Sequence, residues 1–288
     1  MNLQNIITEI EKVDPEVYER FDSRRKVMKN FANLSGKLAL AAVPLAISSM
    51  FSKAYGQTPG NINSILNFAL TLEYLEAEFY TNVVGSPGYL TASAADQAAL
   101  TKIRDDENKH VLFLKSVLGA AAVPKPTFDF TAGNGSNTGP FAGYLGNYAV
   151  QLAMAQTFED TGVRAYKGQA PGLQSNRTVL TAALNIHSVE GRHASHIRVM
   201  RRALNAAIPP AQKPLKPWIT LSYSGITYSP AADAAIQPSY NGEELTTQAG
   251  VNIIGLGGAY NTAAAASEAF DEPLTAAQVL AIVDPFIV

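Results

Sequence analysis

The stretches Glu107-Asn108-Lys109-His110 and Glu190-Gly191-Arg192-His193 share one spacing, a glutamate three positions before a histidine. On a helix, this spacing projects both side chains from one face, about one turn apart. The chain has 288 residues and four histidines, and two of these histidines carry such a glutamate. Carboxylate oxygen together with imidazole nitrogen suits divalent iron or manganese and leaves positions for a substrate. The two stretches therefore predict a metal site between two helices.

A second pattern repeats on two other predicted helices. Glu73 precedes Tyr80 by seven positions, and Glu159 precedes Tyr166 by seven, two turns along one helix face in each case. A carboxylate on an apolar helix face is costly unless it is paired or binds a metal. Tyr80 and Tyr166 are the predicted catalytic residues, which would donate a hydrogen bond or an electron. The predicted metal ligands, six for two ions, are Glu73, Glu107, His110, Glu159, Glu190 and His193.

Four segments around these residues have helical periodicity. They are residues 62–84, residues 96–118, a third segment from Ala142 or Tyr144 to Tyr166, and residues 175–207. A loop rich in proline and glycine at 121–142 separates the two pairs, and such a long crossover is typical of a ferritin-like four-helix bundle. We therefore predict an all-α fold. The expected C-terminal stops of the first three helices are Gly85, Gly119 and Gly168.

The bundle is predicted to occupy residues 57–210, and residues 211–288 form a less regular C-terminal extension. After Pro214 the sequence changes to short apolar stretches separated by turns rich in glycine and alanine. A short helix is expected near residues 276–283. Because the extension carries few charges, we expect it to pack on the bundle.

Residues 1–56 are predicted to be an export segment. Ser23–Lys29 contains a twin-arginine block, and the apolar run Leu38–Met50 and the small residues Ala54 and Gly56 follow it. The run is shorter than the roughly 20 residues of a membrane span and is typical of a signal peptide. The block resembles the signal read by the twin-arginine machinery, which implies a periplasmic or extracellular bacterial protein. The acidic lead-in leaves an uncleaved membrane anchor open, and an amphipathic helix with incidental basic residues is the alternative.

The composition excludes several classes of function. The chain has no cysteine, which removes disulfides, thiolate zinc sites, iron–sulfur clusters and a cysteine nucleophile. Its formal net charge of −2 argues against nucleic acid as a partner, because phosphate contacts need a basic face. Carboxylate and imidazole remain as the groups that can bind a metal.

The segment Ile65–Ser195 resembles the ferritin-like di-metal carboxylate superfamily, which includes ferritins, bacterioferritins, rubrerythrins and manganese catalases. The phrases Leu72–Tyr80 and Ser267–Thr275 are similar to a bacterial ferritin-like group that also contains plant desiccation-related proteins. The resemblance implies two iron or manganese ions as the cofactor. It also implies terminal carboxylates at Glu73 and Glu159, bridging carboxylates at Glu107 and Glu190, imidazole ligands at His110 and His193, and nearby tyrosines at Tyr80 and Tyr166.

Two ligand assignments have alternatives. Glu76 and Glu78 compete with Glu73, and we favour Glu73 because it alone has a tyrosine seven positions later. In a site like that of manganese catalase, Glu190 would support the ligands instead of binding metal.

Other polar residues also allow two interpretations. His187 and His196 would either hydrogen-bond to the ligands or occupy polar positions on the bundle surface. Three arginines flank the acidic residues, namely Arg104, Arg164 and Arg192. They would either neutralise the acidic cluster or form salt bridges at the surface or the bundle ends.

Two classes of function fit these residues. The first is an exported di-metal oxidoreductase that acts on peroxide or dioxygen, in the manner of a catalase or peroxidase. The absence of cysteine disfavours a rubrerythrin-like route with a rubredoxin-type centre. The second is a non-enzymatic stress, desiccation-related or metal-sequestering protein, and a metal-free bundle with a satisfied polar network is the alternative to a metal site. The sequence leaves open the choice of iron or manganese and whether the chain forms a homo-oligomer.

Overall fold

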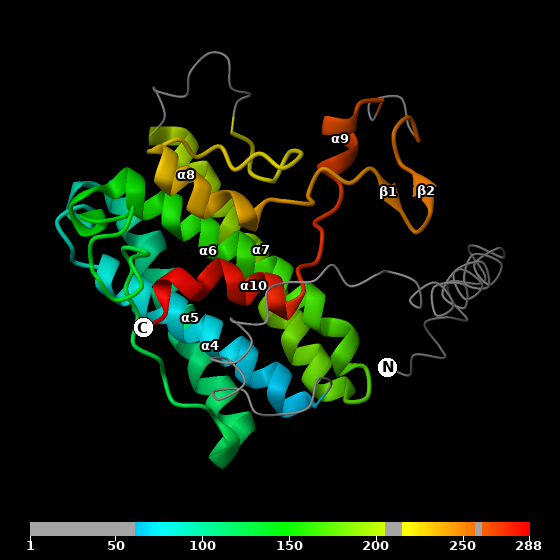
Figure 1. Cartoon of the computed structure of the whole chain (residues 1–288), viewed down its shortest axis with the longest axis horizontal. Helices are drawn as coiled ribbons and strands as arrows, with labels where there is room; N and C mark the ends of the chain where they lie inside the picture. Colours follow the sequence, from blue (N-terminus) through cyan, green and yellow to red (C-terminus); the bar gives the residue numbers. More distant parts are fainter. Residues whose placement is uncertain (1–60, 205–214, 257–260) are drawn as a thin grey trace. The chain divides into compact units, whose positions relative to one another are not determined.

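Helices α4 (Ile62–Val83) and α5 (Ala94–Leu118) form the first pair, joined through the 3₁₀ turn η1 (Tyr89–Thr91) (Figure 1). A side-chain oxygen at the N-cap residue before α5 accepts a backbone hydrogen bond from its first turn. Gly85 and Gly119 follow the two helices with φ of +87° and +55°, a conformation that glycine adopts without strain. Both predicted glycine stops are therefore confirmed.

Helices α6 (Tyr148–Gln169) and α7 (Arg177–Leu204) form the second pair. The connection between the pairs is long, as predicted, and contains the 3₁₀ turns η2 (Gly119–Ala121) and η3 (Tyr144–Gly146). The third bundle helix begins later than predicted, because η3 is a separate turn and the side chain of Asn147 caps α6. The predicted all-α bundle with a long crossover is confirmed.

Gly168 does not end α6, and the predicted stop at this position is wrong. The helix continues to Gln169 and leads into the 3₁₀ turn η4 (Ala170–Leu173). A Cβ atom at Gly168 would overlap the carbonyl oxygen of Leu274 in the C-terminal extension. The glycine is therefore needed for close backbone approach and not for a turn.

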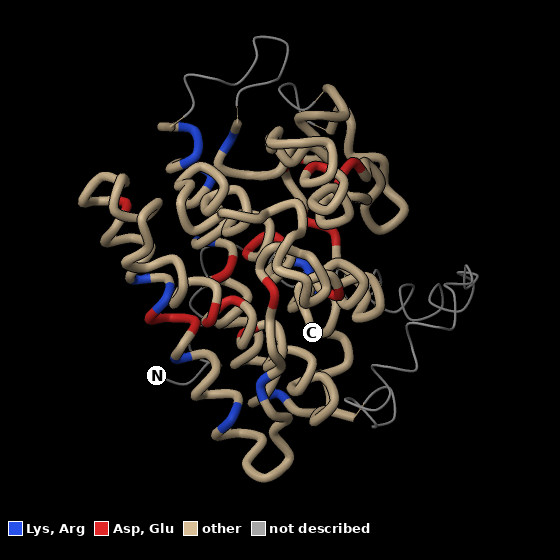
Figure 2. Tube along the Cα trace, turned by 60° about the vertical axis from the view of Figure 1, so that its left-hand side comes forward, with Lys and Arg blue, Asp and Glu red and all other residues tan. Residues whose placement is uncertain are grey.

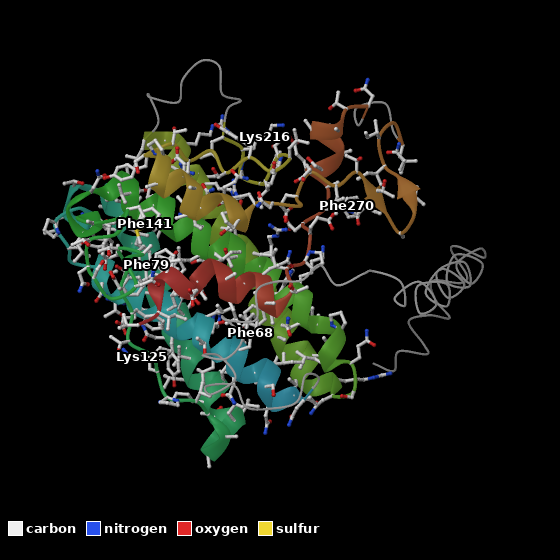
Figure 3. All side chains as sticks on the ribbon, viewed as in Figure 1. Phe68, Phe79, Lys125, Phe141, Lys216 and Phe270 are labelled. Carbon is white, nitrogen blue, oxygen red and sulfur yellow. The ribbon has the colours of Figure 1, made fainter. Side chains whose placement is uncertain are left out.

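Helix α6 lies at the centre of the core, since residues 150–166 are all buried. It packs against α7, α4 and the C-terminal helix α10 (Ala276–Val283). Phe79, labelled in Figure 3, contacts the rings of Tyr80 and Phe158 edge to face, with ring centroids 5.2 and 5.1 Å away. A helix that is buried all round has no solvent face, so its charged side chains need partners inside the protein.

The C-terminal extension consists of short elements and is tied to the bundle by Arg164 of α6. The guanidinium group of Arg164 donates hydrogen bonds to the carbonyl oxygens of Ser239, Asn241 and Glu272 at 2.6, 2.9 and 2.8 Å. Helix α10 coincides with the helix predicted at 276–283. The other elements are α8 (Pro230–Ile236), η5 (Gln237–Ser239), β1 (Thr247–Gln248), β2 (Val251–Asn252), α9 (Ala263–Ser267) and η6 (Asp284–Phe286).

The computed structural model describes residues 61–204, 215–256 and 261–288. All of these except residues 249–251 belong to one compact unit. The predicted export segment at residues 1–56 lies outside the described residues. Within the described ranges, no helix combines the length and the apolar character that a membrane span requires.

Candidate metal centre

Four glutamates and two histidines meet inside the bundle, and Figure 2 shows acidic residues in red on neighbouring helices. The four glutamates are 0% exposed, so none of them is solvated by bulk water. The structure thus brings together the residues that the sequence pattern singled out. They are Glu73 on α4, Glu107 and His110 on α5, Glu159 on α6, and Glu190 and His193 on α7.

The donor atoms form two overlapping groups, each with atoms that lie within 4.8 Å of one another. The first group is Glu73, Glu107, His110 and Glu190, and the second is Glu107, Glu159, Glu190 and His193. Glu107 and Glu190 belong to both groups, which is the arrangement expected of carboxylates that bridge two ions. Glu73 and Glu159 belong to one group each, as terminal ligands would.

The two tyrosines hydrogen-bond to the terminal glutamates across the helix pairs. The hydroxyl of Tyr80 on α4 donates to Glu159 Oε1 on α6 at 2.6 Å. The hydroxyl of Tyr166 on α6 donates to Glu73 Oε1 on α4. Each tyrosine therefore holds one carboxylate oxygen and leaves the other, Oε2, facing the nearest imidazole.

Both imidazoles turn Nδ1 toward the carboxylates. His110 Nδ1 lies 2.9 Å from Glu107 Oε2 and 3.2 Å from Glu73 Oε2. His193 Nδ1 lies 2.8 Å from Glu107 Oε1 and 3.2 Å from Glu159 Oε2. The two halves of the site are thus arranged alike, with Glu107 between two imidazoles.

Several donor atoms of the cluster have no hydrogen-bond partner among the described residues. They are Glu107 Oε1, Glu159 Oε2, both carboxylate oxygens of Glu190, and His193 Nδ1. Glu107 Oε1 and His193 Nδ1 are 2.8 Å apart, yet their orientation is not that of a hydrogen bond. Buried polar atoms without partners are costly, and a cation at the point where their lone pairs converge would satisfy them. The residues present therefore fit a pair of metal ions.

The carboxylates dominate the electrostatics of the site. Burial opposes charge on the imidazoles, but the hydrogen bonds and charges of Glu107 and Glu73 outweigh it and raise the pKa of His110 to about 10. Burial is likewise outweighed by Glu159 and Glu107, which raise the pKa of His193 to about 11. Burial and the neighbouring carboxylates raise the pKa of Glu190 well above its ordinary value. Without metal ions the cluster gathers protons, and the binding of metal ions would release them.

Glu76 is a further carboxylate of this cluster, which the sequence interpretation set aside in favour of Glu73. It is 3% exposed, and burial followed by the charge of Glu159 raises the pKa of Glu76 well above its ordinary value. Glu76 Oε1 and Glu190 Oε2 lie 3.2 and 3.1 Å from the point where a Cβ on Gly162 would stand. The sequence contained this signal, because Glu76 follows Glu73 by one helical turn.

The three arginines are not partners of the cluster in the described part of the chain. Arg104 pairs with Asp105 at 2.7 Å on the surface of α5. Arg164 pairs with Glu243 of the extension at 2.7 Å, and both side chains are 1% exposed. Arg192 is exposed. The interpretation as a surface salt bridge therefore describes Arg104, whereas the ion pair of Arg164 is buried and joins α6 to the extension.

His187 and His196 contribute none of the donor atoms in the two groups that the described residues form. His196 is exposed, as expected for a polar position on the bundle surface. His187 is half-buried, and burial lowers the pKa of its imidazole.

Comparison with known proteins agrees with this geometry. The family model described as the ferritin-like domain matches residues 62–203, from the first residue of α4 into the last turn of α7. No curated protein and no solved structure matches the chain significantly. The matched segment contains all four bundle helices and both groups of donor atoms. Residues 62–203 of this chain are thus similar to the ferritin-like domain family.

Proposed function

We propose that this chain is an exported oxidoreductase that binds two iron or two manganese ions and acts on peroxide or dioxygen, with peroxide the better fit. The observation that carries the proposal is the set of unpartnered donor atoms in two groups that share Glu107 and Glu190. Each group would hold one ion. Carboxylate with imidazole accepts both iron and manganese, so this donor set supports either metal.

When bound, such a metal pair supplies a reversible change of oxidation state next to open coordination positions. The residues of the chain supply the surroundings. The surrounding side chains keep bulk water away from the four glutamates, which are 0% exposed. The hydroxyls of Tyr80 and Tyr166 hold protons beside Glu159 and Glu73, where they can be donated to a reactant oxygen.

Peroxide disproportionation suits an enclosed centre because it needs no external reductant. One hydrogen peroxide accepts two electrons and two protons and leaves as two waters. A second gives up two electrons and two protons and leaves as dioxygen. The protons that the second molecule releases equal those that the first consumes, so groups that hold protons locally are sufficient.

Metal content and peroxide turnover of the natively exported protein test this proposal together. We expect two metal ions per chain, and we expect Glu107→Ala and His193→Ala to lose metal and turnover in parallel. Glu78→Ala is the matched control on α4, because Glu78 pairs with Lys125 outside the two donor groups. Bound metal without turnover would indicate a metal-sequestering protein. A metal-free protein whose stability is unchanged in both variants would contradict the metal site.

The proposal includes export through the twin-arginine machinery, which Arg24 and Arg25 support. The double substitution Arg24→Lys with Arg25→Lys should retain the protein in the cytoplasm, as measured by cell fractionation. A control with Arg20→Lys, outside the block, should be exported normally. Export of the double variant at the natural rate would contradict this route.

A further inference from the structure

The metal centre needs a passage for reactants, because its four glutamates are 0% exposed. The imidazoles differ from them, since the side chains of His110 and His193 keep 12% and 9% exposure. His110 lies on α5, and His193 lies on α7. The side of the cluster that approaches solvent is therefore the histidine side.

A groove of about 380 Å³ between α5 and α7 reaches His193. His193 turns Nδ1 toward Glu107, and its Nε2 lies 3.5 Å from Asp106 Oδ2, which belongs to the groove wall. The ring of His193 thus forms the inner end of the groove, next to the carboxylates. The main lining residues are Lys102, Asp106, Val189, Arg192, His193 and His196.

The rim of this groove is polar and carries more positive than negative charge. Lys102 pairs with Asp106, which leaves their joint charge close to zero. Arg192 is exposed and has no ion-pair partner among the described residues. The exposed imidazole of His196 adds a further polar group. Such a rim admits small uncharged or anionic molecules more readily than divalent cations.

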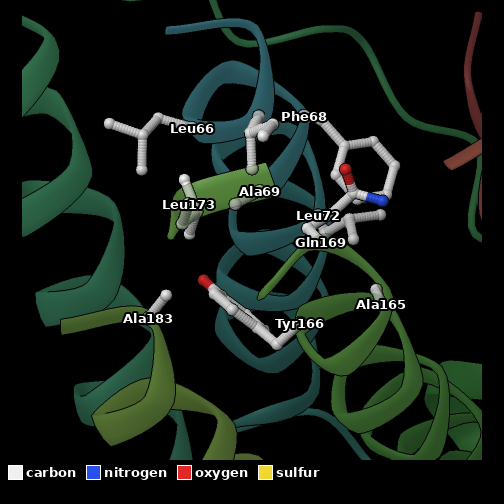
Figure 4. A pocket seen from close by; sticks show the side chains of 10 residues that line it. Leu66, Phe68, Ala69, Leu72, Ala165, Tyr166, Gln169, Leu173 and Ala183 are labelled. Atoms are coloured by element: carbon white, nitrogen blue, oxygen red, sulfur yellow. The ribbon is translucent and has the colours of Figure 1, made fainter. Parts of the chain in front are cut away.

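A second cavity beside the site is unsuited to a polar reactant. It measures about 10 Å³ and lies next to Tyr166, where apolar side chains such as Leu72, Leu173 and Ala183 form most of its wall (Figure 4). An apolar cavity of this size offers peroxide few hydrogen-bond partners.

We propose that the groove between α5 and α7 is the entrance through which small peroxides and small anions reach the metal centre, with His193 at its inner end. The nature of the reactant rests on the proposed function. The route rests on the exposure of the imidazoles and on the groove that ends at His193.

A removable label that blocks the groove tests whether reactants reach the metal centre through it. The chain has no cysteine, so Val189→Cys places a single thiol in the groove, and Val199→Cys places a matched thiol on an exposed part of the same helix. In the metal-loaded protein, a bulky methanethiosulfonate label at position 189 should slow azide binding by about tenfold or more, and reduction of the label should restore the rate. The label at position 199 should leave the rate unchanged. Equal azide rates with and without the label at position 189 would overturn the proposal.

Reversal of one charge at the rim tests whether the rim attracts anions to the groove. Arg192→Glu should slow azide association by about threefold or more at low ionic strength, because it removes a positive charge from the mouth and adds a negative one. Consumption of uncharged peroxide should not slow with it. Arg177→Glu is the control, since Arg177 is exposed at the start of α7 and does not line the groove. An azide rate that is the same in both variants would overturn the role of the rim.

The route can also be tested without metal, which separates it from the proposed function. Hydroxyl radicals oxidise solvent-accessible histidines whatever their protonation state, and mass spectrometry locates the oxidised residue. In metal-free protein, the label on Val189→Cys should protect His193, whereas the label on Val199→Cys should not. If the natural protein binds no metal, the proposed function fails while this protection still decides the route. Modification of His193 at an equal rate in both labelled proteins would overturn the route itself.

Discussion

Tyr80 on α4 donates its 2.6 Å hydrogen bond to Glu159 on α6, and not to the glutamate that precedes it on its own helix. Tyr166 on α6 makes the reverse contact with Glu73 on α4. Residue numbers rise along one helix as they fall along the other, which is the pattern of two helices that cross in opposite directions. The two tyrosines therefore connect the two helix pairs of the bundle at the candidate metal centre.

Tyr80→Phe removes one buried donor and keeps the ring. Glu159 then loses its hydrogen bond inside the core, so the metal-free protein should lose about 1–3 kcal/mol of unfolding free energy. Urea unfolding measures this loss. Tyr228→Phe is the control, because Tyr228 is 48% exposed and its substitution should cost less than about 0.5 kcal/mol. Equal losses in the two variants would contradict the role of the Tyr80 hydroxyl.

The raised pKa values predict that the metal-free protein becomes less stable in alkali. The folded pKa values of His110 and His193, about 10 and 11, lie above the ordinary histidine value of 6.5. Their stabilising contribution is therefore complete below about pH 6.5 and is lost as the pH rises through the folded values. The raised pKa of Glu190 acts in the same direction.

Urea unfolding across a pH series, with and without metal, checks this prediction. The unfolding free energy of the metal-free protein should fall as the pH rises from neutral to about 10. The metal-loaded protein should show a weaker fall, because metal ions replace the protons of the cluster. A metal-free protein that gains stability over this range would contradict the prediction.

Gly162→Ala should weaken metal binding by about tenfold, because its Cβ would stand 3.1 Å from Glu190 Oε2 and 3.2 Å from Glu76 Oε1 and displace them. Metal titration with calorimetric detection measures the affinity. Gly191→Ala is a matched control on α7, where a Cβ meets no described atom within 4 Å outside its chain neighbours and the local helix backbone. It should keep the affinity and stabilise the helix by up to about 1 kcal/mol. Equal metal affinities in the two variants would show that metal binding does not depend on the space beside Gly162.

Gly168→Ala should loosen the C-terminal extension, since the added Cβ would overlap the carbonyl oxygen of Leu274. Crowding of this kind costs about 1–3 kcal/mol in well-packed cores. We expect faster proteolysis of the extension while α4–α7 keep their helical circular dichroism. Unchanged proteolysis would indicate that the extension tolerates the shift.

Much of the centre could be predicted from the sequence because its ligands lie on helices. A helix fixes which face a residue occupies, so the spacing of Glu107 and His110 was sufficient to place them together. The helix ends at Gly85 and Gly119 could be predicted as well, because each glycine follows the last apolar position of its helix.

The contacts between helices could not be read in this way. The seven-residue spacing places Glu73 and Tyr80 on one face of a helix, but it does not give the partner of the Tyr80 hydroxyl. The antiparallel crossing of α4 and α6 makes that partner Glu159. Glycine often ends a helix, but Gly168 instead makes room for the backbone of Leu274, more than a hundred residues away. The tyrosine spacing favours Glu73 over Glu76, yet both carboxylates are buried in the same cluster.

We propose that two metal ions bind between the helices and share Glu107 and Glu190, which belong to both groups of donor atoms. Anomalous diffraction from crystals of the natively exported protein, collected above the iron and manganese absorption edges, tests it most directly. We predict two anomalous peaks per chain, each in contact with both of these carboxylates, one beside His110 and the other beside His193. A well-ordered cluster without anomalous density in protein that was never exposed to chelators would contradict the claim.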